Sequence, residues 1–151
     1  MTEPGYKENI QTAKELVAQG KGEEMMPGSA FWAPITANRF LDLQDIGGSD
    51  DFFSSDFTDE QMVERLGHVG TNASLKVLVA CSGSDEYVPK HVSSKALVRR
   101  MVDAMNHECR DETTMVAEEL YLESGNHNLS EGDGDGNEFV KRVTELLKRV
   151  P

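Results

Sequence analysis

Cysteine is scarce in this sequence. Only Cys81 and Cys109 occur among the 151 residues. Two cysteines cannot form the disulfide framework of a small secreted protein, and a chain of this length does not need one. We therefore expect a reducing compartment, with the cytoplasm as the simplest assignment.

Long hydrophobic runs are absent as well. No apolar stretch approaches the ~20 residues that a membrane-spanning helix needs. The first residues, MTEPGYKENIQ, lack the basic segment followed by an apolar one that marks a secretory signal. The sequence thus predicts neither a secretory signal nor a membrane span.

Basic residues are few compared with acidic ones. The chain has 15 Lys and Arg against 27 Asp and Glu, which gives a formal net charge of −12. Such a chain repels the phosphate backbone of nucleic acids and anionic lipid headgroups. We therefore expect no nucleic-acid partner and no membrane partner.

Hydrophobic periodicity predicts four helices within a chain long enough for one domain with a real core. These helices are expected at residues 7–19, 58–66, 94–107 and 138–150. Gly20 supplies a stop for the first helix. Thr58, with Gln61 three residues later, is typical of a capping box at the start of the second.

Residues 29–57 show no clear period but concentrate the aromatic side chains. They hold five of the six phenylalanines and the only tryptophan. A long irregular segment with large apolar groups is often a lid or a binding loop. A small core beneath a loop is an equal alternative. We interpret residues 1–70 as a lid-like or cap-like segment.

Two strands are expected, at residues 75–81 and 115–122. The first is nearly all apolar, which suits a strand buried on both faces. Glu118 and Glu119 in the second would have to lie near an end or on an open face. A helix separates the two strands, so the pattern predicts a parallel pair in an α/β sheet, with residues 71–151 forming a strand–helix–strand–helix unit. Because parallel sheets are normally larger, part of the sheet is expected to be missing from the chain.

Two turns that follow these strands carry the candidate chemistry. Asp85 comes after the first strand and His127 after the second. Since functional groups gather at the carboxyl ends of parallel strands, we expect these side chains to lie close together. Each alone also has an ordinary explanation, as a turn cap or an exposed loop histidine. The order acid then histidine is that of the α/β-hydrolase triad.

On these residues the sequence resembles the α/β-hydrolase superfamily. Within it, the chain is similar to the C-terminal half of a fungal group of uncharacterised and siderophore-esterase-like hydrolases (DUF1749-like). The strongest stretches are SDEYVP at residues 84–89 and GNHN at residues 125–128. Weaker similarity lies at residues 20–27, 34–39 and 50–56.

The resemblance implies a serine esterase that acts on a small-molecule carboxylic ester without a cofactor or a metal. Asp85 would fix the tautomer and orientation of His127, and His127 would act as the general base. Glu86, next to Asp85, is the less favoured acid. The aromatic segment would be a lid that lines the acyl or substrate pocket.

The nucleophile of this family is not found in the sequence. It belongs to a Gly-x-Ser-x-Gly elbow, and the chain contains no such motif. Ser84 lies in the acid turn itself, and Cys81 is expected to be a buried, inert thiol. The oxyanion-hole segment and the first strands are missing too. We therefore expect one partial α/β-hydrolase domain over residues 1–151, from a truncated, split or shortened hydrolase that is inactive alone.

An open sheet edge predicts a partner. The partner would be a second copy of the chain or a complementary N-terminal half that carries the serine. The alternative function is a non-catalytic binding or regulatory module derived from a hydrolase. Ligand binding without hydrolysis would favour that alternative.

Two patterns in the sequence are candidates for a metal site. Asp133, Asp135 and Asn137 match the start of an EF-hand calcium loop, but the glycine and the final glutamate of that loop are replaced by Glu138 and Thr144. A zinc site at His107 and Cys109 lacks a second ligand pair with suitable spacing. The sequence therefore predicts no metal site.

Overall fold

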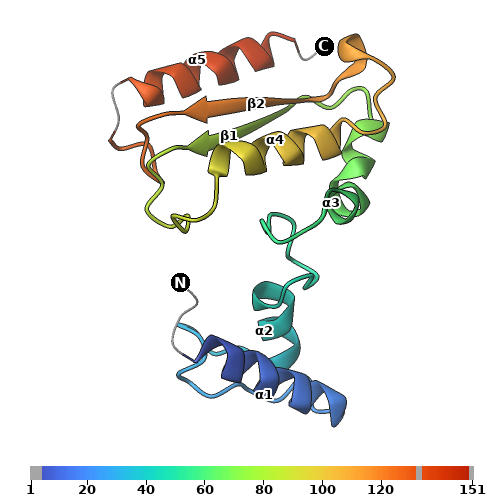
Figure 1. Ribbon diagram of the computed structural model, residues 1–151, viewed down its shortest axis with the longest axis vertical. Helices are drawn as coiled ribbons and strands as arrows, with labels where there is room; N and C mark the ends of the chain where they lie inside the picture. The colour runs from blue at the N-terminus through green and yellow to red at the C-terminus, as the bar shows by residue number, and fades with distance from the viewer. Residues whose placement is uncertain (1–4, 132–133, 150–151) are drawn as a thin grey trace. The chain divides into compact units, whose positions relative to one another are not determined.

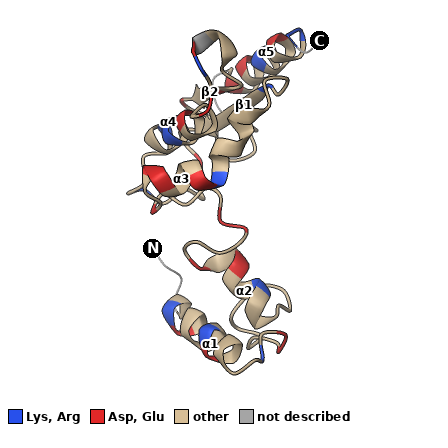
Figure 2. Cartoon of the chain, turned by 90° about the vertical axis from the view of Figure 1, so that its right-hand side faces the viewer, with Lys and Arg blue, Asp and Glu red and all other residues tan. Residues whose placement is uncertain are grey.

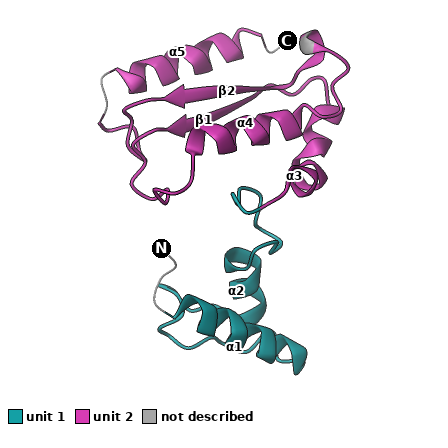
Figure 3. Cartoon of the chain, viewed as in Figure 1, with its two compact units in different colours: residues 1–56 teal, residues 57–151 magenta. Residues whose placement is uncertain are grey.

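The computed structural model describes residues 5–131 and 134–149 of the chain (Figure 1). The chain divides into two compact units, residues 1–56 and residues 57–151 (Figure 3). Within the described residues, both strands belong to the second unit.

The first unit is built on α1 (Tyr6–Ala18) and α2 (Ala37–Gln44). The predicted first helix is confirmed within one residue, and Gly20 follows it with a φ of 75°, a conformation that favours glycine. The segment that connects α1 to α2 folds back on itself, and the backbone N–H of Met26 donates a hydrogen bond of 2.9 Å to the carbonyl of Ile35. A small core joins these parts, made of Ile10, Ala13, Met26, Ile35, Ala37 and Phe40.

Helix α2 lies inside the segment for which the sequence indicated no period. Its N-cap is Thr36, whose hydroxyl accepts a hydrogen bond of 3.3 Å from the backbone N–H of Arg39. Only Ala37 and Phe40 of this helix are buried. Eight residues make two turns, so the helix is too short to reveal its period in the sequence.

The second unit begins with α3 (Asp59–Leu66) and the short 3₁₀ helix η1 (Gly67–Thr71). The predicted capping box is present, because the backbone N–H of Gln61 donates to the Thr58 hydroxyl at 3.2 Å and the backbone N–H of Thr58 donates to the Gln61 side chain at 2.9 Å. Helix α3 packs on α4 (Ser94–Met105). An ion pair of 2.6 Å between Arg100 and Asp59 joins the same two helices.

The sheet consists of β1 (Val77–Ser82) and β2 (Ala117–Leu122), which pair in parallel from Val77 opposite Ala117 to Ser82 opposite Leu122. Helix α4 forms the crossover, and the 3₁₀ helix η2 (Glu112–Thr114) precedes β2. Helix α5 (Asp135–Leu147) ends the unit. The predicted α/β class and the parallel pair are confirmed (Figure 1).

Helices α4 and α5 cover opposite faces of this sheet. Glu118 pairs with Arg142 of α5 at 3.3 Å, whereas its neighbour Glu119 lies 3.4 Å from Arg99 of α4. Successive side chains of a strand point to opposite faces, so the two helices flank the sheet. Figure 2 shows acidic and basic residues along α5. The sequence placed Glu118 and Glu119 near a strand end or on an open face. In the structure each of them forms an ion pair with the helix that covers its face of the sheet.

Strand β1 is less buried than the sequence predicted. All six of its residues are half-buried or exposed, and Ala80 is exposed. Within the described residues, β2 is the only strand that pairs with β1. The other edge of β1 is therefore not covered by a strand of the described residues. An apolar strand with one uncovered edge is expected to form further contacts.

Asn106 ties the end of α4 to the start of β2. Its side-chain oxygen accepts hydrogen bonds of 3.0 Å from the backbone N–H groups of Val116 and Ala117, and its amide donates to the carbonyl of Ala117 at 2.8 Å. One side chain therefore satisfies three backbone groups and fixes where β2 begins.

None of the helices in residues 5–131 and 134–149 is both long enough and apolar enough to cross a membrane.

Candidate active site

The turns that follow β1 and β2 lie against each other at the carboxyl ends of the strands. The backbone N–H of Gly83 donates to the carbonyl of Leu122 at 2.6 Å, and the N–H of Ser84 donates to the carbonyl of Gly125 at 3.0 Å. A Cβ at Gly83 would come within 2.5 Å of the backbone carbonyl oxygen of Glu123, which belongs to the other turn. The close approach of the two turns therefore requires glycine at position 83.

Asp85 and His127 form a hydrogen-bonded pair across these turns. The Nδ1 of His127 lies 3.0 Å from Oδ2 of Asp85, although the two residues are 42 positions apart. The Asp85 side chain is 17% exposed and the His127 side chain 59% exposed. The other Asp85 oxygen accepts from the backbone N–H of Tyr87 at 2.9 Å. The structure thus brings together the acid and the histidine that the sequence singled out.

Two neighbours hold His127 from other sides. The Glu86 carboxylate accepts a hydrogen bond of 3.1 Å from the backbone N–H of His127. The Tyr87 ring meets the imidazole edge-on, with 4.8 Å between the ring centroids. Glu86 therefore contacts the backbone of His127 rather than its ring, and Asp85 is the carboxylate that orients the imidazole.

The pKa values of the pair move apart. The hydrogen bond to Asp85, together with the charge of that carboxylate, raises the pKa of His127 above its ordinary 6.5. For Asp85, partial desolvation raises the pKa, but hydrogen bonds from His127 and from the backbone N–H of Tyr87 outweigh it, so the pKa is lowered overall. These directions are those of a carboxylate that stabilises an imidazolium.

The His127 loop is held by Asp135, one of the three residues that match the start of an EF-hand loop in the sequence. Oδ2 of Asp135, at the start of α5, accepts hydrogen bonds of 2.8 Å and 2.6 Å from the backbone N–H groups of Ser124 and Gly125. It also accepts from the Ser124 hydroxyl at 3.1 Å. Nothing in the local sequence indicates this contact, because the donors lie ten and eleven positions earlier in the chain.

A cavity of about 380 Å³ adjoins the acid turn. It is lined by residues of the β1–α4 connection, among them Ser82, Asp85, Glu86 and Val92. His127 is not one of its lining residues. The cavity therefore offers space next to the acid that the imidazole of His127 does not line.

Neither alternative nucleophile is favoured by its surroundings. Cys81 is half-buried, and burial raises the pKa of its thiol, which keeps it protonated at neutral pH. The backbone N–H of Ser84 is bonded to Gly125, so this residue is part of the turn that carries the acid.

Metal coordination finds no support in the part of the chain that is described. That part contains no group of three or more His, Cys, Asp or Glu side chains that could hold a metal ion. Of the EF-hand-like positions, Asp133 lies outside the described residues. Asp135 is engaged by the backbone of the His127 loop.

Residues 1–148 match the family described as "Protein of unknown function (DUF1749)". The chain belongs to the DUF1749 family. The family assignment agrees with the resemblance that the sequence motifs indicated.

Relatives of this DUF1749 chain include named esterases of fungi. It is 34% identical over 125 residues to "Esterase AN6793" of Emericella nidulans, and the aligned region covers 77% of this chain and 32% of the relative. It is 36% identical over 81 residues to "Fusarinine C esterase sidJ" of Aspergillus fumigatus, and the aligned region covers 49% of this chain and 23% of the relative. The relatives support a hydrolase or esterase family.

A solved structure also matches the DUF1749 chain. The siderophore hydrolase EstB from Aspergillus fumigatus superposes with a TM-score of 0.74 at 25% identity, over 97% of this chain and 48% of that one. This DUF1749 chain therefore spans about half the length of the matching structure. It spans about a third or less of the length of the curated relatives that it matches.

Proposed function

We propose that this chain is the acid- and histidine-bearing part of a serine esterase that hydrolyses carboxylic esters. Asp85 orients His127 and stabilises its imidazolium. His127 removes the proton from a serine hydroxyl as the ester is attacked and returns it to the leaving alcohol.

The observation that carries this proposal is the 3.0 Å contact between His127 Nδ1 and Asp85 Oδ2. A triad histidine uses Nδ1 for the acid and Nε2 for the serine. Within the described residues, the structure has no hydrogen bond at His127 Nε2, and the side chain is 59% exposed. The nitrogen that would face a serine is therefore available to one.

The proposal includes a nucleophile from outside this sequence. No Gly-x-Ser-x-Gly elbow occurs here, and the chain covers about a third or less of its named esterase relatives. A complementary N-terminal half, in the same polypeptide or in a separate one, would supply the serine and the oxyanion hole. The uncovered edge of β1 is the place where further strands would pair, and a second copy of the chain is the competing occupant.

The substrate class proposed is a small-molecule ester. One relative is named a fusarinine C esterase, and the matching solved structure is named a siderophore hydrolase. Ester-linked siderophores are therefore the first substrates to test. The aromatic segment within residues 1–70 would serve as the lid over the acyl or substrate pocket.

The test starts from the 5′ end of the transcript that encodes this chain. If an in-frame upstream region encodes a serine elbow, the complete protein should hydrolyse p-nitrophenyl butyrate, and His127→Ala should lower kcat by about 10⁴-fold or more. The matched control is His107→Ala, since His107 is an exposed histidine whose ring nitrogen Nδ1 lies 3.4 Å from the carboxylate of its neighbour Glu108. This control should retain full turnover.

Two outcomes contradict the proposal. One is ester hydrolysis by the complete protein that survives His127→Ala. The other is a transcript that begins at Met1 together with a chain that gains no esterase activity from an elbow-bearing half. In either case the pair of Asp85 and His127 is not the catalytic acid and base of an esterase.

A further inference from the structure

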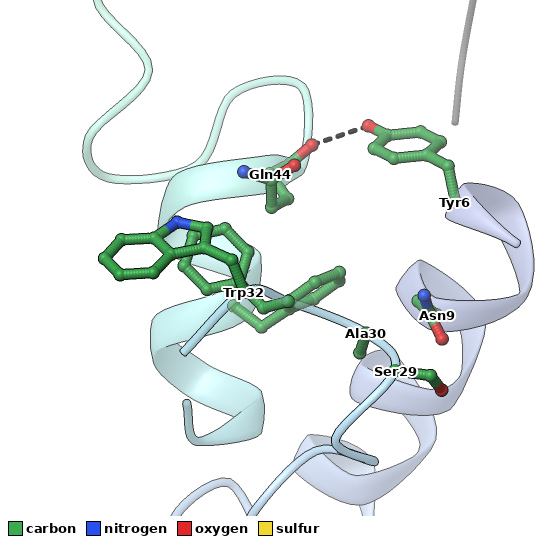
Figure 4. A pocket seen from close by; sticks show the side chains of 8 residues that line it. Tyr6, Asn9, Ser29, Ala30, Trp32 and Gln44 are labelled. Atoms are coloured by element: carbon green, nitrogen blue, oxygen red, sulfur yellow. Dashed lines mark hydrogen bonds between the residues drawn. The ribbon is translucent and has the colours of Figure 1, made fainter. Parts of the chain in front are cut away.

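A cavity in the first unit is separate from the residues that carry the proposed hydrolysis. It has a volume of about 230 Å³ and lies among α1, α2 and the segment that connects them (Figure 4). Eight residues line it, including Tyr6, Asn9, Ser29, Phe31, Trp32 and Gln44. All of them belong to residues 1–56, so the cavity is defined within one unit.

The lining of this cavity carries no formal charge. Charged residues make up 28% of the chain, yet none of the eight lining residues is charged. Burial raises the pKa of the Tyr6 phenol, which keeps it protonated, and its hydroxyl donates to the carbonyl of Gln44 at 2.5 Å. The charges that act on the pKa of that hydroxyl include Asp45 and Lys14, which pair with each other at 2.8 Å. A charged ligand would find no partner of opposite charge in this lining.

Three polar side chains of the lining are available for hydrogen bonds. Within the described part of the chain, the structure gives no hydrogen-bond partner to the side chains of Asn9, Ser29 or Gln44. The two amides offer both N–H donors and carbonyl acceptors, and the hydroxyl offers one donor and two acceptor sites. Such groups are complementary to a carbonyl, an amide or a hydroxyl of a ligand.

An aromatic cluster forms the apolar part of the lining. The Phe31 ring lies 5.6 Å from the Trp32 ring and 6.5 Å, edge-on, from the Phe40 ring. Trp32 is 89% exposed, although it is the only tryptophan of the chain. A large aromatic side chain left in water beside a cavity is typical of a binding surface.

We propose that this cavity binds a small uncharged molecule that combines a short apolar chain with an amide or ester carbonyl. The apolar chain would lie against Phe31 and Trp32. The polar end would exchange hydrogen bonds with Asn9 and Gln44. The proposal does not rest on the Asp85–His127 pair, because binding here requires no hydrolysis.

The single tryptophan gives a direct readout on the full chain. Hexanamide is the probe, and hexanoate and hexylammonium are charged molecules of the same chain length. A bound ligand removes water from Trp32, so hexanamide should shift its emission to shorter wavelength and saturate with a Kd of about 1 mM, as expected for so small a ligand. Both charged probes should bind at least about tenfold more weakly, because each would lose its hydration without gaining a partner.

A matched pair of variants on α1 tests the assigned residues. Asn9→Ala removes a lining amide and should raise the Kd for hexanamide about fivefold, the effect of one hydrogen bond. Gln11→Ala changes an exposed residue of the same helix, whose amide bonds to Glu15 at 2.7 Å, and should leave the Kd unchanged. Both variants should keep the circular dichroism of the unaltered chain, since alanine favours helix.

Three results would each overturn the proposal. The first is the absence of a saturable emission change with hexanamide. The second is equal affinity for hexanamide and either charged probe. The third is an equal Kd for the Asn9→Ala and Gln11→Ala proteins. None of these results tests the Asp85–His127 pair, because ester hydrolysis is measured with a different substrate and with a substitution at His127.

Discussion

Asp135 and Gly125 are joined by a hydrogen bond of 2.6 Å between the carboxylate of the first and the backbone N–H of the second. Gly125 lies two residues before His127. The same carboxylate oxygen holds the N–H of Ser124 at 2.8 Å. The start of α5 therefore fixes the loop from which the candidate general base projects, and Asp135 is a positioning residue rather than a catalytic one.

Replacing Asp135 should loosen this loop. Asp135→Ala removes the acceptor of two backbone N–H groups, so we expect the free energy of unfolding to fall by about 1–3 kcal/mol. Amide hydrogen exchange at Ser124 and Gly125 should accelerate. Glu131→Ala is the control, since it removes an exposed carboxylate from the same loop. Unchanged exchange at both amides in the Asp135→Ala protein would show that they are protected by something else.

Asn106 should be important for stability although it is not part of the site. Asn106→Ala leaves the backbone N–H groups of Val116 and Ala117 and the carbonyl of Ala117 without this partner, and we expect a loss of about 2 kcal/mol in the free energy of unfolding. Urea denaturation measures this loss. The matched control is Asn137→Ala, an exposed position in α5 that should change stability by less than about 0.5 kcal/mol. Equal effects at the two positions would refute the assigned role.

The Cys81 thiol should react slowly with disulfide reagents. Burial raises its pKa, and the nearby charge of Asp85 acts in the same direction, while a hydrogen bond from Ser94 opposes the shift. In the Cys109→Ser protein, where Cys81 is the only thiol, we expect reaction with a disulfide reagent at pH 8 to be slower than that of free cysteine. A rate equal to that of free cysteine or above it would make Cys81 a candidate nucleophile.

Part of this fold could be predicted because it depends on local patterns. The apolar stripe of residues 94–107 and the capping residues Thr58 and Gln61 act within one or two helical turns. The parallel pair follows from a helix between two strands. Asp85 and His127 could be placed together for the same reason, because adjacent parallel strands end at one edge of the sheet.

Other features depend on contacts that no local pattern encodes. Helix α2 buries only Ala37 and Phe40, so its period was too short to detect. Asp135 bonds to backbone groups ten or more positions away, and a backbone donor leaves no trace in the residue type. The burial of β1 was overestimated because apolar composition reports what a strand can pack against, whereas its exposure depends on which neighbours are present.

The pH dependence of the candidate base follows from its raised pKa. His127 can accept a proton only when its imidazole is neutral, and Asp85 favours the protonated form. In a complete enzyme, the contribution of His127 as a base should therefore be lost as the pH falls through a value above 6.5. If the midpoint of the acidic limb in the pH–rate profile lay below pH 6.5, His127 paired with Asp85 would not be the base that limits the rate.

The most direct test is an NMR titration of His127 in the chain as it is, with His127→Ala used to assign the signal. We expect a pKa above 6.5 for His127 in the unaltered chain and a return toward 6.5 in the Asp85→Asn protein. The exposed carboxylate of Glu131 serves as control, so Glu131→Gln should leave the raised value in place. A His127 pKa that is the same with Asp85 and with asparagine at position 85 would contradict the pairing on which the proposed function rests.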